Sequence, residues 1–293
     1  MIYLGSEKLG AIYLGDEKIG KVFLGSELVY NSDGGGGGGG IIVFADAAVK
    51  AICVSHWDTS GDGELDTSEA AAVTTLSTYF RNNTSITSFD ELQYFTGLTK
   101  INGGGIYAGA FDGCTNLESI VLPVSVTEVQ GYAFRNCSKL TDINLGRLSI
   151  VGAYAFNGCS LLTSVDLSSC TTINNYGFGS CGLASVVLPA IVTLGTNAFR
   201  YCSSLASVDI GSGCTSIGQY AFGGCSALVS CIVRATTPPT LGTFVFSGTN
   251  ASLKIYVPYS ADHSVLAAYQ AANNWSGVAS KIYELDSNGN IPT

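Results

Sequence analysis

The residues best suited to chemistry lie in one twelve-residue acidic segment, Asp58-Thr-Ser-Gly-Asp-Gly-Glu-Leu-Asp-Thr-Ser-Glu69. Oxygen-bearing residues occupy positions 1, 3, 5, 7, 9 and 12 of this segment: Asp58, Ser60, Asp62, Glu64, Asp66 and Glu69. Glycine stands at position 6 and an apolar residue at position 8. Oxygen donors at this spacing suit Ca²⁺, a hard cation that takes about six to eight oxygen ligands. We therefore expect a calcium site in this loop.

The spacing is that of an EF-hand loop, which assigns a role to each oxygen. Asp58, Ser60 and Asp62 would supply side-chain oxygens and Glu64 its backbone carbonyl. Asp66 would bind directly or through water, and Glu69 through both carboxylate oxygens. Ser60 replaces the more usual Asp or Asn, so we expect modest affinity, roughly 0.1–1 mM. A solvated acidic turn without an ion is the alternative interpretation.

Helical spacing on both sides of the loop indicates the elements that position it. Apolar residues predict a helix over residues 44–57, and an alanine-rich stretch predicts a second helix over residues 68–80. Calcium sensors usually pair two hands, whereas we find one such loop, so we expect a structural ion. Its expected task is to hold these two helices as a cap on the repeats that follow.

A repeat of 21 to 24 residues occupies the chain from Gly109 onward. It is most visible in a phenylalanine ladder: Phe111, Phe134, Phe156, Phe178, Phe199, Phe222 and Phe246. Each unit continues with Cys, Leu, Ile or Val, and a final Leu or Ile, as in Phe111-Cys114-Leu117-Ile120-Leu122. A period in this range predicts a solenoid. Spacings of three suit a helical turn and the final spacing of two suits a strand, so each coil is expected to be a turn-helix followed by a strand.

This pattern, Ala-Phe-x-x-Cys-x-x-Leu-x-x-Ile-x-Leu-Pro at residues 110–123, resembles the BspA-like (treponemal-type) leucine-rich-repeat family. Residues 44–101 resemble the N-terminal region that accompanies such repeats in proteins of gut anaerobes, and residues 255–283 resemble their C-terminal cap. The resemblance covers roughly residues 41–293 and implies surface adhesion rather than catalysis. The expected fold is an α/β repeat solenoid with a helical calcium-loop cap, a C-terminal cap and a small N-terminal β-meander.

Three decads open the chain: Ile2-Tyr-Leu-Gly5, Ile12-Tyr-Leu-Gly15 and Val22-Phe-Leu-Gly25, each followed by Ser-Glu or Asp-Glu. They predict strands near residues 9–14, 19–24 and 28–30. Such a small meander leaves open edges, so we expect it to dock on another structure, with a strand extension folding back on its own chain as the alternative. The glycine run at residues 34–40 predicts a flexible tether, and bundled extended helices in an oligomer are the rarer alternative. The expected divisions are 1–33 anchor, 34–40 linker, 41–106 N-terminal cap, 107–250 solenoid and 251–293 C-terminal cap.

The decads also resemble attachment modules of phage tail-associated proteins of gut bacteria. We therefore expect residues 1–30 to dock an oligomeric form of the chain on a phage tail or similar multi-subunit particle, in a virion. The solenoid would then face a glycan or protein of the host surface. The alternative is a bacterial cell-surface or extracellular adhesin of the same repeat family. No secretion signal is recognisable from Met1 onward.

Two rows of repeat residues are candidate binding surfaces. One row of tyrosines lies two residues before the ladder phenylalanines, at Tyr132, Tyr154, Tyr176 and Tyr220. Such rings could stack on a sugar or anchor a partner, although a structural row that covers the coil boundaries is the favoured interpretation. The other row is polar and lies on the predicted strand face, at Asp142, Asn144, Asp166 and Asp209. Extended strand faces are the usual binding surfaces of solenoids.

Other classes of function find little support in the sequence. The formal net charge of −9 disfavours nucleic acid and anionic membranes, and no apolar stretch is long enough to span a bilayer. Six of the ten cysteines recur at one repeat position, where buried free thiols are favoured over disulfides. The two histidines lie in no nucleophile or metal motif, so we expect no enzyme activity.

Overall fold

The computed structural model describes residues 39–103, 105 and 107–292, together with six short strands between residues 3 and 31. These strands form three antiparallel pairs: β1 (Tyr3–Leu4) with β2 (Glu7–Lys8), β3 (Tyr13–Leu14) with β4 (Glu17–Lys18), and β5 (Lys21–Leu24) with β6 (Glu27–Asn31). Among these described strands, each pair lies within one decad. Of the glycine run, only Gly39 and Gly40 fall within the described residues, so the two interpretations of this linker remain predictions.

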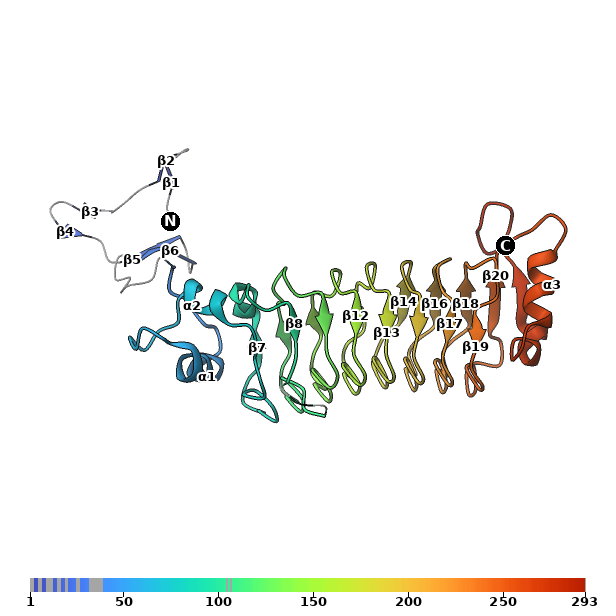
Figure 1. The fold of residues 1–293 in the computed structure, drawn as a ribbon, viewed down its shortest axis with the longest axis horizontal. Helices are drawn as coiled ribbons and strands as arrows, with labels where there is room; N and C mark the ends of the chain where they lie inside the picture. The colour runs from blue at the N-terminus through green and yellow to red at the C-terminus, as the bar shows by residue number, and fades with distance from the viewer. Residues whose placement is uncertain are drawn as a thin grey trace.

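The repeats form a parallel β-solenoid whose coils stack along the long axis of the molecule (Figure 1). One side of it is a continuous seven-stranded parallel sheet: β8 (Lys100–Ile101), β10 (Glu128–Val129), β12 (Ile150–Val151), β13 (Thr172–Ile173), β15 (Thr193–Leu194), β17 (Ser216–Ile217) and β19 (Thr240–Leu241). From β10 onward, each of these strands ends on the apolar residue five positions before a ladder phenylalanine. The sequence pattern thus contains a second strand in each coil, beside the predicted one.

The other side of the solenoid carries the predicted strands in two separate sheets. The first contains β7 (Ser88–Phe89), β9 (Ser119–Ile120) and β11 (Asp142–Ile143). The second contains β14 (Ser185–Leu188), β16 (Ser207–Ile210), β18 (Ser230–Val233), β20 (Lys254–Val257) and β21 (Ile282–Glu284). Between these sheets, residues 164–167 belong to no strand, so the strand prediction is wrong for that one coil.

The predicted turn-helices are turns without an α-helix. In a representative coil, the Tyr132 and Phe134 amides donate to the carbonyls of Ala153 and Ala155 in the next coil, at 2.9 and 2.7 Å. Amides that bond between coils are not available for a helix. Tyr132 also has a φ of 64°, a left-handed conformation that interrupts any helix. The coils are therefore held together by a backbone ladder around the turn as well as by the sheets.

The core is a stack of phenylalanine rings enclosed by these elements. The ring centroids of Phe134 and Phe156 are 5.3 Å apart, and those of Phe156 and Phe178 are 5.0 Å apart, with nearly parallel planes. The stack begins one coil earlier than the sequence pattern suggested, because Phe80 stacks on Phe111 at 5.1 Å. Every one of these rings is fully buried.

The N-terminal cap contains two α-helices, α1 (Ala47–Trp57) and α2 (Thr67–Ala72), and the 3-10 helix η1 (Asp90–Tyr94). The prediction of a helix to Phe80 is wrong in its C-terminal half, because α2 ends at Ala72. Phe80 instead belongs to the first turn of the solenoid. At the other end lie α3 (Ser264–Ala271) and the 3-10 helix η2 (Ser276–Lys281). Within the described ranges, no helix is long and apolar enough to span a membrane.

Candidate functional site

The predicted calcium loop connects α1 to α2 and is closed on itself by carboxylate–amide hydrogen bonds. The Asp58 carboxylate accepts from the amides of Gly61 at 2.6 Å and Gly63 at 2.9 Å. Glu69, from the first turn of α2, accepts from the Thr59 and Ser60 amides at 2.8 and 2.9 Å. The first and last residues of the loop are thus brought together, as a calcium loop requires.

Hydrogen bonds keep the two terminal carboxylates of this loop ionised. The amide of Gly63, followed by that of Gly61, lowers the pKa of Asp58. Burial raises the pKa of Glu69, but bonds from the amides of Asp66, Ser60 and Thr59 outweigh it, so the pKa is lowered overall. Asp66 caps α2 by accepting from the Ser68 and Glu69 amides, both at 2.7 Å. In the part of the chain that the structure describes, no three His, Cys, Asp or Glu side chains are arranged to hold a metal ion.

The other loop residues have distinct roles. The Glu64 side chain forms an ion pair with Lys50 at 2.7 Å, so it is not needed inside the loop, in keeping with the expected use of its carbonyl. The carbonyl of buried Leu65, at position 8, accepts from the Ile42 amide at 2.8 Å, and the Thr67 amide donates to the Gly40 carbonyl at 3.0 Å. Residues 40–42 therefore support this single loop with a β-bridge.

Buried carboxylates join α1 and the residue before its cap to the segment of residues 87–91. Asp46 accepts at the N-terminus of α1 from the Ala48 and Val49 amides and also from the Thr87 amide, the latter at 2.7 Å. Burial raises the pKa of Asp46, but these bonds outweigh it and lower the pKa below its usual value. Glu91 is also buried and accepts from the Ala45 amide at 2.8 Å. Movement of α1 would break these bonds.

The cysteine ladder has a structural role. Each of its six thiols donates to the carbonyl of the phenylalanine one coil earlier, with S···O distances between 2.9 and 3.2 Å. The interpretation as buried free thiols is confirmed, since all ten cysteines are free and buried. Burial raises the pKa of Cys114 and of Cys202 to about 12, which suppresses the reactive thiolate.

The tyrosine row is continuous over three coils. The Tyr132 and Tyr154 rings stack at 5.1 Å, and those of Tyr154 and Tyr176 at 4.6 Å. The rings are half-buried and turn their faces toward one another, which leaves edges and hydroxyls at the surface. Asn197 interrupts the row, and Tyr220 resumes it by stacking on Phe244 at 5.2 Å. Faces that cover each other favour the structural interpretation over stacking on a sugar.

The four polar candidates of the strand face differ in what they can offer a ligand. Asn144 uses both ends of its amide on the backbone of Leu122, at 2.6 and 3.0 Å. Asp166 accepts from the Ser168 amide at 2.9 Å and lies against Gly146, outside the sheets. Asp209 forms two hydrogen bonds with Arg234, at 2.8 and 2.7 Å. Asp142 is exposed on β11.

The sheet of β14, β16, β18, β20 and β21 presents a regular outward face. Its central row is in register across all five strands, in the order Val187, Asp209, Ile232, Tyr256 and Tyr283. Val187 is 60% exposed and Tyr283 is 44% exposed. Tyr283 was not predicted as part of this face, because β21 lies in the C-terminal cap and its residues do not follow the repeat.

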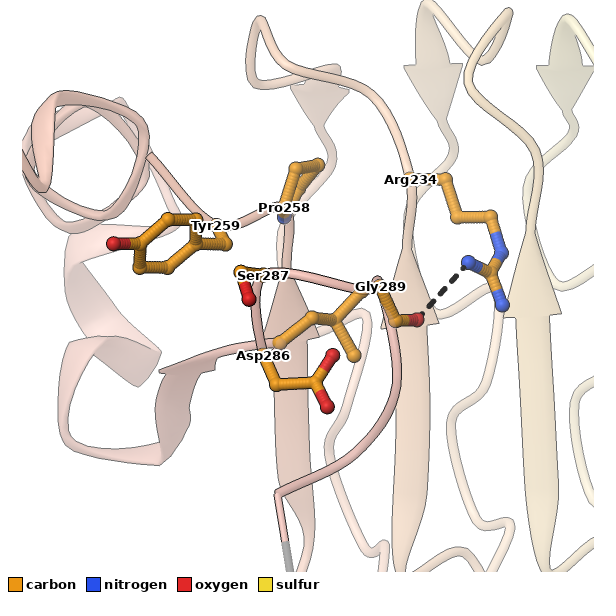
Figure 2. Close-up of a pocket in the computed structure, with 7 residues that line it drawn as sticks. Arg234, Pro258, Tyr259, Asp286, Ser287 and Gly289 are labelled. Carbon is orange, nitrogen blue, oxygen red and sulfur yellow. Dashed lines mark hydrogen bonds between the residues drawn. The ribbon is translucent and has the colours of Figure 1, made fainter. Parts of the chain in front are cut away.

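A hollow of about 230 Å³ adjoins this row, beside the ends of β18, β20 and β21. Figure 2 shows Arg234 on one side of it, with its Nη1 donating to the Gly289 carbonyl at 3.5 Å, and Tyr259 and Pro258 on the other. Asp286 holds the intervening loop by accepting from the amides of Asn288 and Asn290. Arg234 thus links Asp209 of this row to the hollow.

Comparison with known proteins is informative for the repeats. The family described as BspA type leucine rich repeat region, in six copies, matches residues 74–206 and 192–276. A leucine-rich repeat protein from Bacteroides ovatus is 28% identical over 56% of this chain and 47% of its own, with a TM-score of 0.44. A leucine rich cell surface protein from Faecalibacterium prausnitzii is 21% identical over 63% of this chain and 64% of its own, with a TM-score of 0.37. A leucine-rich repeat protein from T. pallidum is 25% identical over 64% of this chain and 78% of its own, with a TM-score of 0.35.

The chain spans about half the length of the Bacteroides ovatus protein. No curated protein matches the chain. These comparisons do not concern an EF-hand or a phage tail, so the docking of residues 1–30 on a particle stays a prediction. The repeat family typically provides non-enzymatic protein-interaction modules. Because the family pattern extends over well more than half of the sequence, and the structure is the solenoid that this pattern predicts, the chain belongs to the BspA type leucine-rich-repeat family.

Proposed function

We propose that this chain is a non-enzymatic recognition module displayed at a bacterial surface, which binds a protein or glycan through the outward face of β14, β16, β18, β20 and β21. The observation that carries the proposal is the in-register row with exposed Val187 and Tyr283 at its ends. Solenoids present such extended sheets as binding surfaces.

The chemistry of this face suits a broad partner surface. The neighbouring row of the sheet, two residues earlier on each strand, contains Ser185, Ser207 and Ser230, whose short side chains allow a partner to approach closely. The Asp209–Arg234 pair offsets its own charges, so that the apolar and aromatic residues of the row remain the strongest anchors. Aromatic residues and arginine contribute strongly to interfaces.

The test replaces Val187 with glutamate in the full chain. A charge within the proposed interface is expected to weaken binding at least tenfold, because it would be desolvated without a partner. Binding of the fluorescently labelled protein to intact cells is measured before and after protease or periodate treatment of the cells, which distinguishes protein from glycan ligands.

Val124→Glu is the matched control, since Val124 is 66% exposed and lies in no strand. The proposal expects Val187→Glu and Tyr283→Ala to lose binding while Val124→Glu retains it. Equal losses in all three variants, or none, would assign recognition to another surface.

We further propose that the loop of residues 58–69 binds Ca²⁺ as a structural ion. Support comes from the oxygen donors at EF-hand spacing and from the way Asp58 and Glu69 close the loop. Asp58, Ser60, Asp62, Asp66 and Glu69 would hold the ion with the Glu64 carbonyl. Calcium there would neutralise the carboxylates and fix α1 relative to α2. To bind the ion, Glu69 would have to give up its hydrogen bonds with the Thr59 and Ser60 amides.

Calcium is expected to raise the stability of the N-terminal cap. At 10 mM calcium and a Kd of roughly 0.1–1 mM, the gain is about 1.4–2.7 kcal/mol. Thermal unfolding followed by Trp57 fluorescence, in a variant lacking Trp275, should show a higher midpoint with calcium than with EDTA.

Two matched variants distinguish stabilisation by a bound calcium ion from a general effect of salt. Glu69→Gln should lose the calcium response, whereas Glu64→Gln, which breaks only the Lys50 ion pair, should retain it. Isothermal titration calorimetry measures binding directly. An unchanged midpoint and no heat of binding for the wild type would leave the loop as a solvated acidic turn.

A further inference from the structure

The last turn of the solenoid, residues 243–248, ends the backbone ladder that joins all earlier turns. In the preceding coil, the amides of Tyr220 and Phe222 donate to the carbonyls of Thr243 and Val245, both at 3.1 Å. The residues at the same positions of the last turn are Phe244 and Phe246. Within the described residues, neither of their amides has a hydrogen-bond partner.

The C-terminal cap completes the other ladders of the solenoid. The outward sheet continues through β20 and β21. Trp275 covers the end of the phenylalanine stack, with its ring centroid 6.4 Å from that of Phe246. The Asn274 side chain donates to the Leu241 carbonyl at 2.6 Å, at the end of the seven-stranded sheet. Among these described elements, only the hydrogen-bond ladder of the turns ends with unbonded amides.

A groove of about 460 Å³ lies beside the open turn, where a further coil would otherwise continue the stack. Its walls are residues 241–247 on one side and Asn274, Gly277 and Val278 on the other. The volume lies in the range of ligand pockets, about 300–1,000 Å³. By analogy with the interior coils, the amides of Phe244 and Phe246 are directed along the solenoid axis into this groove.

A second observation marks the same place. The Phe244 side chain is 61% exposed and ends the aromatic row, with Tyr220 against one face of its ring. Its backbone keeps the left-handed conformation of the equivalent tyrosines, with a φ of 60°, so the last turn has the shape of the turns that bond to a following coil. An exposed aromatic ring beside two unbonded amides favours an amphipathic occupant over water alone.

We propose that this groove binds an extended segment of a partner polypeptide, whose backbone carbonyls accept from the Phe244 and Phe246 amides and whose side chain packs on the Phe244 ring. The interior coils show the chemistry that completes the ladder: backbone carbonyls two residues apart. Carbonyls two apart lie on the same edge of an extended peptide, which is how open edges capture strands. The residue between them is aromatic in most coils, as at Tyr154 between Ala153 and Ala155, so an aromatic residue that stacks on Phe244 is expected at that position of the occupant.

The test uses the full chain and an array of random-sequence decapeptides, with a glycan array in parallel. Gly277→Trp fills the groove, because a side chain at Gly277 would meet open space. We expect the wild type to bind a set of peptides, and Gly277→Trp and Phe244→Ala to bind them at least tenfold more weakly. Val124→Trp is the matched control for an added surface tryptophan and should bind as the wild type does.

Deuterium exchange locates the contact. Addition of a selected peptide should slow exchange of the Phe244 and Phe246 amides, and Val187→Glu on the outward sheet should leave this protection unchanged. Failure of the outward-sheet proposal would thus not affect this result. Capture of glycans instead of peptides, peptides bound equally by Gly277→Trp, or unprotected amides would each overturn the proposal.

Discussion

Replacement of Phe178 with alanine is expected to lower the free energy of unfolding by about 3–5 kcal/mol, the usual cost of deleting a buried aromatic side chain. Phe178 is fully buried, and its ring stacks on Phe156 at 5.0 Å and on Phe199 at 5.6 Å. Alanine would leave the turn backbone intact, including the bond from the Phe178 amide to the Ala198 carbonyl at 2.8 Å. The change therefore isolates the ring. Because each coil contacts only its neighbours, the loss weakens two interfaces at once.

Urea unfolding followed by far-ultraviolet circular dichroism measures this effect. Leu161→Ala, one coil earlier, is the control, since Leu161 is 51% exposed and its truncation should change stability by less than about 0.5 kcal/mol. A loss of less than about 1 kcal/mol for Phe178→Ala would show that the ring stack is not the continuous core of the solenoid. Urea transitions that differ between optical probes would indicate partly unfolded arrays, which the two-state treatment does not cover.

Much of this core could be predicted because a solenoid places equivalent residues on top of one another. The ladder phenylalanines and cysteines differ by one repeat in sequence, and the stacking of coils brings them into contact. Periodicity alone therefore identified the buried face and its aromatic ladder. It also identified one strand per coil, although the coil around Val165 and Leu167 lacks it.

The prediction of helical turns was wrong because sequence spacing does not show where backbone amides bond. A spacing of three fits an α-helix and also fits a series of turns, as in the bond from the Cys137 amide to the Phe134 carbonyl at 3.2 Å. The left-handed conformations of Tyr132 and Asn136 decide between these. A bulky tyrosine gives no signal for this conformation, whereas the glycine that takes the position of Asn136 in other coils, such as Gly158, does.

Ion pairs between neighbouring coils were not predicted, although Arg81, Asp112 and Arg135 each directly follow a phenylalanine of the stack. Asp112 is almost fully buried, yet it forms ion pairs with Arg135 at 2.8 Å and with Arg81 at 3.3 Å. The residue type at this position varies from coil to coil, so the repeat pattern gives no signal for the pair. The Asp209–Arg234 pair is of the same kind, and it removes a carboxylate that the sequence offered as a free binding residue. The loop of residues 58–69 could be proposed as a calcium site from sequence because all its expected donors lie within twelve consecutive residues.

The C-terminal cap provides the last prediction, because Trp275 closes the phenylalanine stack. Trp275 is fully buried, its Nε1–H donates to the Pro239 carbonyl at 2.7 Å, and its ring meets the Tyr269 ring edge-on at 4.9 Å. Trp275→Ala should lower the free energy of unfolding by about 3–5 kcal/mol. Trp275→Phe should lower it by less, about 1–3 kcal/mol, since it keeps an aromatic ring but leaves the buried Pro239 carbonyl without its donor.

The two tryptophans lie in opposite caps, so the variants also report how far the damage spreads. In Trp275→Ala, fluorescence of the remaining Trp57 follows the N-terminal cap during urea unfolding, while circular dichroism follows the whole solenoid. A solenoid that unfolds as one unit should show both transitions shifted to lower urea together. Tyr259→Ala, which truncates a side chain that is 47% exposed in the same cap, should shift neither. If the circular dichroism transition moves while Trp57 fluorescence does not, Trp275 stabilises only the coils next to it; if neither moves, the stack does not depend on this cap.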